Sequence, residues 1–226
     1  MQLKLILLVI IALVSGVQAQ EPKPRNPDGQ SGVTNDDGGR AFIIDRDSAL
    51  LPAAANRSQT PIAAPQQHSV FLGSRWATPE LRVREPELAN LLSNINDQAT
   101  IQTLNESGIK DFFGPTTTRE KLDDLSGRVS DLEIQAVLGG MLKDGSLPAP
   151  NPNTIYIVFL DPKLNSTLGT LFAGKHYAAY HNFLNAGGSK LHYVVVPFEP
   201  DRKVAGQISL RALIAAALNP DGTASN

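Results

Sequence analysis

The sequence predicts an α/β fold: a single layered domain whose small central sheet, mostly parallel or mixed, is flanked by helices and preceded by a disordered leader. Two apolar segments rich in β-branched and aromatic residues, 154–160 and 192–197, are typical of strands buried on both faces. Segments with helical periodicity precede and follow them, and strands that alternate with helices indicate a layered α/β domain.

The first 19 residues have the three parts of a cleavable secretory signal. Lys4 supplies the positive charge, residues 5–14 are all apolar, and Val17 and Ala19 place small side chains where signal peptidase reads them. A membrane anchor is the alternative, but these ten apolar residues would rise only about 15 Å as a helix, half of the ~30 Å hydrocarbon core. We therefore expect cleavage after Ala19, a secreted (periplasmic or extracellular) protein, and no membrane span after cleavage.

The remaining chain divides into a leader, a domain and a tail. Residues 20–68 combine a polar Pro- and Gly-containing stretch with an Ala-, Pro- and Gln-rich one, and we expect a disordered or linker leader. Within it, Ala41–Asp45 could form a short strand. The α/β domain is expected at residues 69–222, and 223–226 are a tail.

The first part of the domain predicts a strand and a broken helix. Ser69–Gly73 is a short apolar run bounded by turn residues, which indicates a buried strand. Leucines at helical spacing from Leu88 predict a helix with a break near Asn96–Asp97, after which Ile101 and Leu104 continue the apolar face. Trp76, which lies between these elements, is interpreted as a core residue.

The clearest helix begins after Ser130. Ser130 is a favourable N-cap, and Glu133 three residues later completes a capping box. Apolar residues from Ile134 to Leu142 then share one face, and Gly145 can end the helix in a left-handed turn. Near the C-terminus, residues 208–218 predict a second helix that is apolar all round and therefore buried.

Composition excludes several classes of site and partner. The chain has no cysteine, which excludes disulfides, a thiolate nucleophile and cysteine-ligated metals. Its formal net charge of -2 argues against nucleic acid as a partner. The sequence also lacks a nucleophile-elbow motif, a Gly-rich phosphate loop and an H-E-x-x-H motif.

The spacing of the four histidines does not favour a metal site. His176 and His181 are five residues apart, a spacing that separates them on a helix and on a strand, although they could meet in a loop. Catalytic zinc needs about three protein ligands. We therefore expect no metal, no cofactor and no catalytic residues, and interpret His192, at the start of a strand, as packed or at its rim.

Residues 180–182 are the best candidate for a binding site. Tyr180, His181 and Asn182 place a phenol, an imidazole and an amide side by side, and His176 lies just before them. Such groups provide donors, acceptors and stacking surface suited to a glycan or a peptide. The alternative is that His181 is a half-buried histidine that anchors a loop. The helical or strand character of residues 174–188 stays open.

Several segments taken in order resemble one family. They are the strand and loop from Phe71 to Trp76, the helix with Asp131, Ile134 and Gln135, the strand before Asp161-Pro162, the Tyr180–Asn182 segment, Val196-Pro197 and Asn219-Pro220. This series is similar to the EXORDIUM family of secreted plant proteins and bacterial relatives, over about Ser69 to Gly222. The resemblance implies a divergent member of that family and an extracellular protein.

The sequence departs from the bacterial relatives in its last helix. Many of those relatives carry a Ser-His-Glu run there, which looks like part of a zinc-protease site, whereas residues 209–218 hold no His, Asp or Glu. We therefore expect a non-enzymatic domain that binds a glycan or peptide in the cell envelope or extracellular space. The alternative is a degenerate or unusual metal-dependent hydrolase that uses His181. The sequence does not indicate an oligomeric state.

Overall fold

The computed structural model describes residues 30–34, 40–47, 60–111, 118–121 and 127–221. The expected signal peptide and the tail at 223–226 lie outside these residues. None of the helices in the described ranges is both long and apolar enough to cross a membrane.

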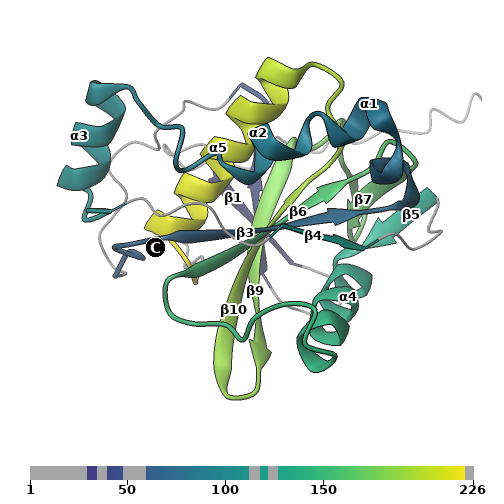
Figure 1. Ribbon diagram of the computed structural model, residues 1–226. Helices are drawn as coiled ribbons and strands as arrows, with labels where there is room; N and C mark the ends of the chain where they lie inside the picture. Colours follow the sequence, from purple (N-terminus) through teal and green to yellow (C-terminus); the bar gives the residue numbers. More distant parts are fainter. Residues whose placement is uncertain (1–29, 35–39, 48–59, 112–117, 122–126, 222–226) are drawn as a thin grey trace, which may run out of the picture.

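The described strands form a main sheet and a smaller one (Figure 1). The main sheet has seven strands in the order β1-β2-β9-β10-β6-β3-β4, and the small sheet has three in the order β5-β7-β8. The strands are β1 Gln30–Thr34, β2 Arg40–Ile44, β3 Gln66–Leu72, β4 Thr118–Lys121, β5 Gly127–Ser130, β6 Thr154–Leu160, β7 Leu164–Leu168, β8 Leu171–Phe172, β9 Ala179–Ala186 and β10 Ser189–Val196. The helices are the 3₁₀ turn η1 Ser74–Ala77 and α1 Pro79–Arg82, α2 Glu85–Ala89, α3 Gln98–Glu106, α4 Asp131–Lys143 and α5 Arg202–Leu218.

The main sheet is mixed, as the sequence predicts. Strands β10, β6, β3 and β4 are parallel, with Val194 opposite Ile157 and Leu72 opposite Leu160. Strands β9, β2 and β1 then add in antiparallel pairs at the β10 side. The carboxyl ends of β2, β10, β6 and β3 consequently meet at one edge of the sheet, where ligands bind in many open α/β sheets.

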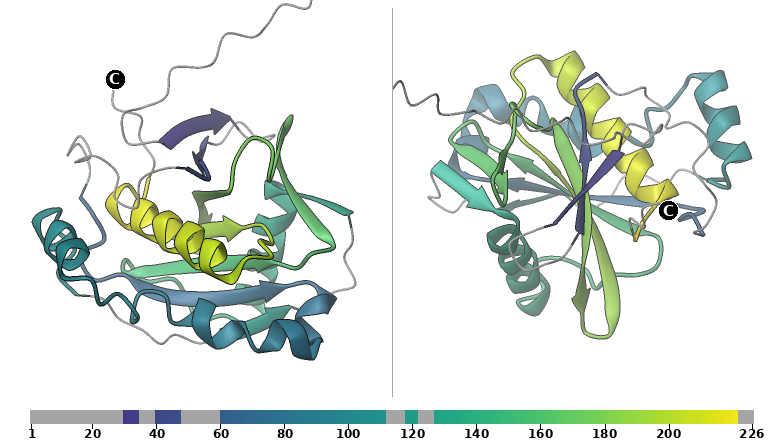
Figure 2. Two further views of the ribbon diagram at one scale, coloured as in Figure 1. Left: turned by 90° about the horizontal axis from the view of Figure 1, so that it is seen from above. Right: turned by 180° about the vertical axis from the view of Figure 1, so that it is seen from behind.

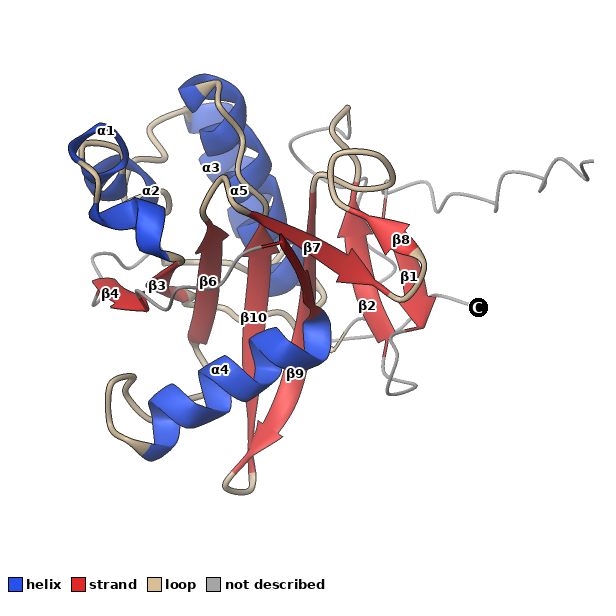
Figure 3. Cartoon of the chain, turned by 90° about the vertical axis from the view of Figure 1, so that its right-hand side faces the viewer, coloured by secondary structure: helices blue, strands red, loops and turns tan. Residues whose placement is uncertain are grey.

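Both faces of the main sheet are covered, which confirms the layered α/β fold. Helix α5 runs along one face together with the region from η1 to α3, and these elements share a core with residues such as Phe71, Trp76 and Ile157 (Figure 2). Helix α4 and the small sheet cover the opposite face, where Ile134, Leu138 and Tyr156 are buried (Figure 3). All seven residues of β6 are buried, as expected for a strand packed on two sides.

Local signals placed several elements correctly. The capping box of α4 is present: Ser130 and Glu133 bond reciprocally at the N-terminus of the helix. Gly145, just after α4, has a positive φ of 77°, which suits a glycine. Trp76 is buried as interpreted, and its Nε1 donates to the Phe159 carbonyl at 3.1 Å.

The main sheet extends further toward the N-terminus than the expected start of the domain at residue 69. Strand β2 confirms the short strand expected around Ala41–Asp45, and it pairs with β9 through Phe42, Ile43 and Ile44. Strand β1 and the first residues of β3 also lie in the 20–68 region. Such short strands carry weak periodicity, so their place in the sheet depends on pairing with distant residues.

A buried aspartate and a glycine join the ends of β3 and β6. Asp161 is wholly buried, and its carboxylate accepts bonds from the backbone N–H groups of Arg75 and Lys163, both at 2.8 Å. Gly73 has a φ of 116°, and a Cβ there would lie 2.4 Å from the Asp161 Cγ. Only glycine fits this approach, which fixes the two strand ends beside the edge described above.

Candidate functional site

Strand β9 divides the three adjacent site candidates between the two faces of the sheet, because successive side chains on a strand point in opposite directions. Tyr180 packs in the core beneath α4, and Asn182 also faces α4, where it bonds to Asp131. His181 points to the other face and stacks on Phe42 of β2, with ring centroids 5.2 Å apart. All three side chains are buried, so they do not form one exposed cluster.

His181 is a buried imidazole. It is 1% exposed, and neither ring nitrogen finds a hydrogen-bond partner among the described residues. Burial lowers the pKa of His181 to about 3, with a further contribution from repulsion by His192 once that ring is protonated at low pH. The ring is therefore neutral at physiological pH. Its burial does not favour direct contact with a ligand, and that role stays a prediction.

His176 lies in the loop between β8 and β9 and is half-buried. Its Nδ1 accepts a bond from the Phe172 backbone N–H at 2.9 Å, and the two rings lie 6.0 Å apart. This contact closes the loop back onto β8. His176 therefore contacts Phe172 of β8, and among the described residues its side chain makes no hydrogen bond or ring contact with Tyr180, His181 or Asn182.

The face of β9 toward α4 carries a buried polar network around Asp131, the first residue of α4. Asp131 is 3% exposed. Its carboxylate accepts bonds from Tyr193 Oη at 2.8 Å, Asn182 Nδ2 at 3.0 Å and Gln135 Nε2 at 2.8 Å. Desolvation, reinforced by this carboxylate, raises the pKa of Tyr193 well above its usual value. The phenol therefore stays protonated and keeps donating.

This network is best interpreted as structural. A carboxylate at a helix N-terminus is favoured by the helix dipole, and three side-chain donors compensate its burial. It ties α4 to β9 and β10. In the sequence, Asp131 and Gln135 belong to one segment of the family resemblance and Asn182 to another. The structure brings these three side chains into hydrogen-bond contact.

An open pocket lies instead at the carboxyl edge of the main sheet. It has a volume of about 240 Å³. Arg46 follows β2, Pro162 follows β6, and Pro197 to Glu199 follow β10, so three strand ends contribute to its wall. Asn165 of the small sheet adds a polar side chain to the lining, and Ile208 of α5 adds an apolar one.

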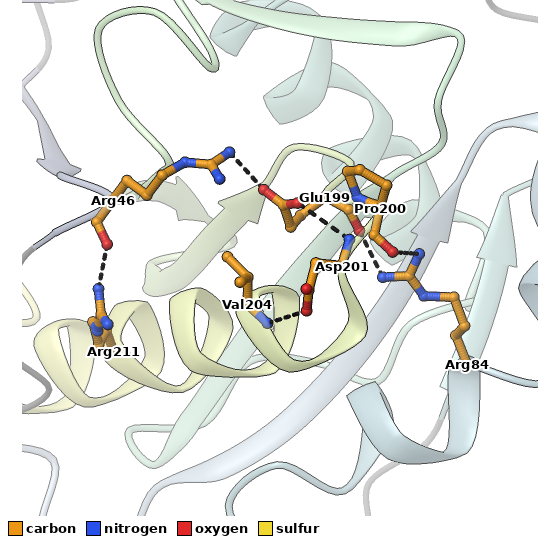
Figure 4. Close-up of polar contacts among 7 residues, drawn as sticks. All are labelled: Arg46, Arg84, Glu199, Pro200, Asp201, Val204 and Arg211. Carbon is orange, nitrogen blue, oxygen red and sulfur yellow. Dashed lines mark hydrogen bonds and ion pairs between the residues drawn. The ribbon is translucent and has the colours of Figure 1, made fainter.

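Glu199 and Arg46 supply the charges of this pocket (Figure 4). The Glu199 side chain is 8% exposed, and its Oε2 accepts a bond from the Arg46 guanidinium at 2.5 Å. Its Oε1 accepts from the Asp201 backbone N–H at 3.2 Å. Arg46 is 56% exposed, and its own carbonyl accepts a bond from Arg211 of α5 at 2.6 Å. Glu199 is therefore fixed in the wall of the pocket, whereas Arg46 faces solvent.

Arg84 holds the loop that carries Glu199. Its guanidinium donates to the Glu199 carbonyl at 2.7 Å (Figure 4). The guanidinium also lies 5.1 Å from the centre of the Phe198 ring. Burial lowers the pKa of Arg84 from its usual value, but a guanidinium stays charged at physiological pH. The buried Arg84 guanidinium thus fixes the backbone at Glu199, which preorganises the Glu199 carboxylate.

Sequence reasoning missed Arg46 and Glu199. Arg46 falls in the expected leader, and Glu199 stands in a short turn between β10 and α5. One signal could have pointed to Glu199: it lies two residues beyond the buried strand predicted at 192–197, and ligands often bind beyond the carboxyl ends of strands in open α/β sheets.

Comparison with protein-family models, curated proteins and solved structures finds no match. The EXORDIUM resemblance therefore stays a prediction. Among the described residues, no group of three or more His, Asp and Glu side chains is placed to hold a metal ion. The alternative of a metal-dependent hydrolase that uses His181 likewise stays a prediction.

Proposed function

We propose that this chain is an exported, non-enzymatic binding domain that holds a glycan or a peptide of the cell envelope or extracellular space in the pocket lined by Arg46 and Glu199. Export rests on the signal peptide predicted at residues 1–19, with cleavage expected after Ala19. The observation that carries the binding proposal is a preorganised charge pair in an open pocket at the carboxyl edge of the sheet.

The lining of this pocket suits a ligand that is polar on one side and apolar on the other. The Arg46 fork donates hydrogen bonds, the Glu199 carboxylate accepts them, and the Asn165 amide can do both. Phe198 and Ile208 add apolar surface. Because the pocket is open, one sugar ring or one peptide side chain can enter while the rest of the ligand extends over the rim.

The charge pair explains how binding can be selective. Glu199 is held by the Asp201 N–H and positioned by Arg84, so it loses little freedom when a ligand binds. Arg46 is more than half exposed and can turn from Glu199 toward a ligand hydroxyl or carboxylate. Charge-assisted bonds of this kind are about twice as strong as neutral ones.

A binding screen with matched variants tests the proposal. The purified protein is applied to glycan and peptide arrays, and each hit is titrated by calorimetry. We expect Glu199→Gln and Arg46→Ala to weaken binding about tenfold or more. Glu87→Gln, which removes a carboxylate paired with Arg202 at the surface, should bind as the unchanged protein does. Hits that bind all variants equally would refute this pocket as the site.

A further inference from the structure

A second and larger pocket lies at the opposite edge of the main sheet. It has a volume of about 540 Å³, within the roughly 300–1,000 Å³ typical of small-molecule sites. The turn before β6, the start of β10, the residues just after α5 and the segment before β3 form its walls. The lining includes Ala63, Asn151, Asn153, Ser189 and His192.

Backbone bonds hold these walls together. The segment before β3 is joined to α5 by the bond from Ile62 N to the Ala217 carbonyl at 2.8 Å, and to the turn before β6 by the bond from Gln66 N to the Asn153 carbonyl at 2.7 Å. Within that turn, the Asn151 side-chain oxygen accepts from the Asn153 N–H at 2.8 Å. The pocket is therefore formed before any ligand arrives.

His192 contributes an imidazole with a defined tautomer. The ring is 8% exposed, and its Nδ1 lies 3.1 Å from the Pro220 carbonyl oxygen. A carbonyl only accepts hydrogen bonds, so Nδ1 carries the proton. Burial lowers the pKa of His192, which keeps the ring neutral at physiological pH. The Nε2 atom consequently has a lone pair and can accept a bond from a ligand hydroxyl.

The charges of the lining cancel. Lys190 and Asp221 are its two charged residues, and they pair with each other at 2.7 Å. The other polar side chains are hydroxyls, amides and the neutral imidazole. A ligand with a free amino or carboxyl terminus would have to break the Lys190–Asp221 pair, whereas an uncharged ligand would not.

We propose that this second pocket binds a neutral oligosaccharide. Sugar hydroxyls both donate and accept, which matches the two asparagine amides, the Ser189 hydroxyl and the Nε2 acceptor of His192. Pro61, Pro152 and Pro220 offer apolar surface to the C–H faces of the sugar rings. This site is separate from the Arg46–Glu199 pocket and does not depend on it.

Nuclear magnetic resonance titration of the purified protein tests this inference. Cellobiose, maltose and N,N′-diacetylchitobiose are the probes, and trialanine, whose amino and carboxyl termini are both free and charged, is the peptide probe. We expect at least one disaccharide to shift the amide signals of Thr60, Ile62, Ala63, Asn151, Asn153 and residues 189–192. The peptide should leave them unchanged.

Two variants test whether the disaccharide binds in this pocket. Ala63 is an exposed lining residue, so Ala63→Trp should fill the pocket without unfolding the protein and weaken disaccharide binding at least tenfold. Ala136→Trp, at an exposed position on α4, is the matched control and should change nothing. Arg46→Ala should also leave these shifts intact, which separates this site from the proposed function. The inference is overturned if no disaccharide shifts these signals, if the peptide does, or if Ala63→Trp binds normally.

Discussion

Replacing His181 with leucine should remove a large part of the acid sensitivity of this fold. The folded state holds His181 neutral, with a pKa of about 3 against an ordinary value of 6.5. The unfolded chain therefore takes up the proton first as the pH falls. The contribution of His181 to stability is complete above pH 6.5 and is lost progressively between pH 6.5 and pH 3.

The size of the effect follows from the pKa difference. Each pH unit below 6.5 lowers the free energy of unfolding by about 1.4 kcal/mol, so the loss at pH 4.5 is about 3 kcal/mol. Leucine has no proton to gain. Since it also replaces an imidazole whose nitrogens lack partners among the described residues, we expect His181→Leu to be at least as stable as the unchanged protein at pH 7.5.

Urea unfolding at pH 7.5 and pH 4.5 measures this difference. Carboxylates and His192 titrate in both proteins, so the change in pH dependence between them reports the loss of His181 together with its interaction with His192. Tyr180→Phe is the matched control, because it alters the neighbouring buried ring of β9 without removing a group that titrates in this range. Equal losses of stability in the unchanged protein and in His181→Leu would refute the reasoning.

Three further stability predictions follow from the fold. Asp131→Ala should lower the free energy of unfolding by about 3 kcal/mol in urea titrations, because the buried Tyr193 and its fellow donors lose their acceptor; a loss below 1 kcal/mol would contradict the network. Gly73→Ala should cost about 2 kcal/mol or more, seen as a lower thermal midpoint, since its Cβ would meet Asp161. Ser130→Ala should cost about 1 kcal/mol by removing the N-cap of α4; an unchanged unfolding midpoint would argue against the capping box.

Local sequence signals predicted the elements that depend on nearby residues. The capping box of Ser130 and Glu133 lies within one turn of helix, and the apolar residues of β6 mark a strand buried on both sides wherever it pairs. The start of α5 was missed by six residues, because Arg202, Lys203, Gly206 and Gln207 interrupt the apolar pattern there. Its N-cap, Asp201, nevertheless bonds to the Val204 N–H as an N-cap should.

The candidate site was harder to predict because its parts are brought together only by tertiary structure. The sequence around His181 suggested a binding group. In the structure β9 pairs with β2 on one side and with β10 on the other, so it lies inside the sheet. No local sequence pattern predicts the pairing with β2. Arg46 and Glu199 are 153 residues apart in the chain. Their contact depends on the order of the strands, which no local pattern specifies.

The most direct test of the central claim is to map a bound ligand onto the protein by nuclear magnetic resonance. A glycan or peptide selected on the arrays should shift the signals of Arg46, Asn165 and residues 197–199, and these shifts should vanish in Glu199→Gln. A tight ligand that leaves all of these signals in place would contradict the account.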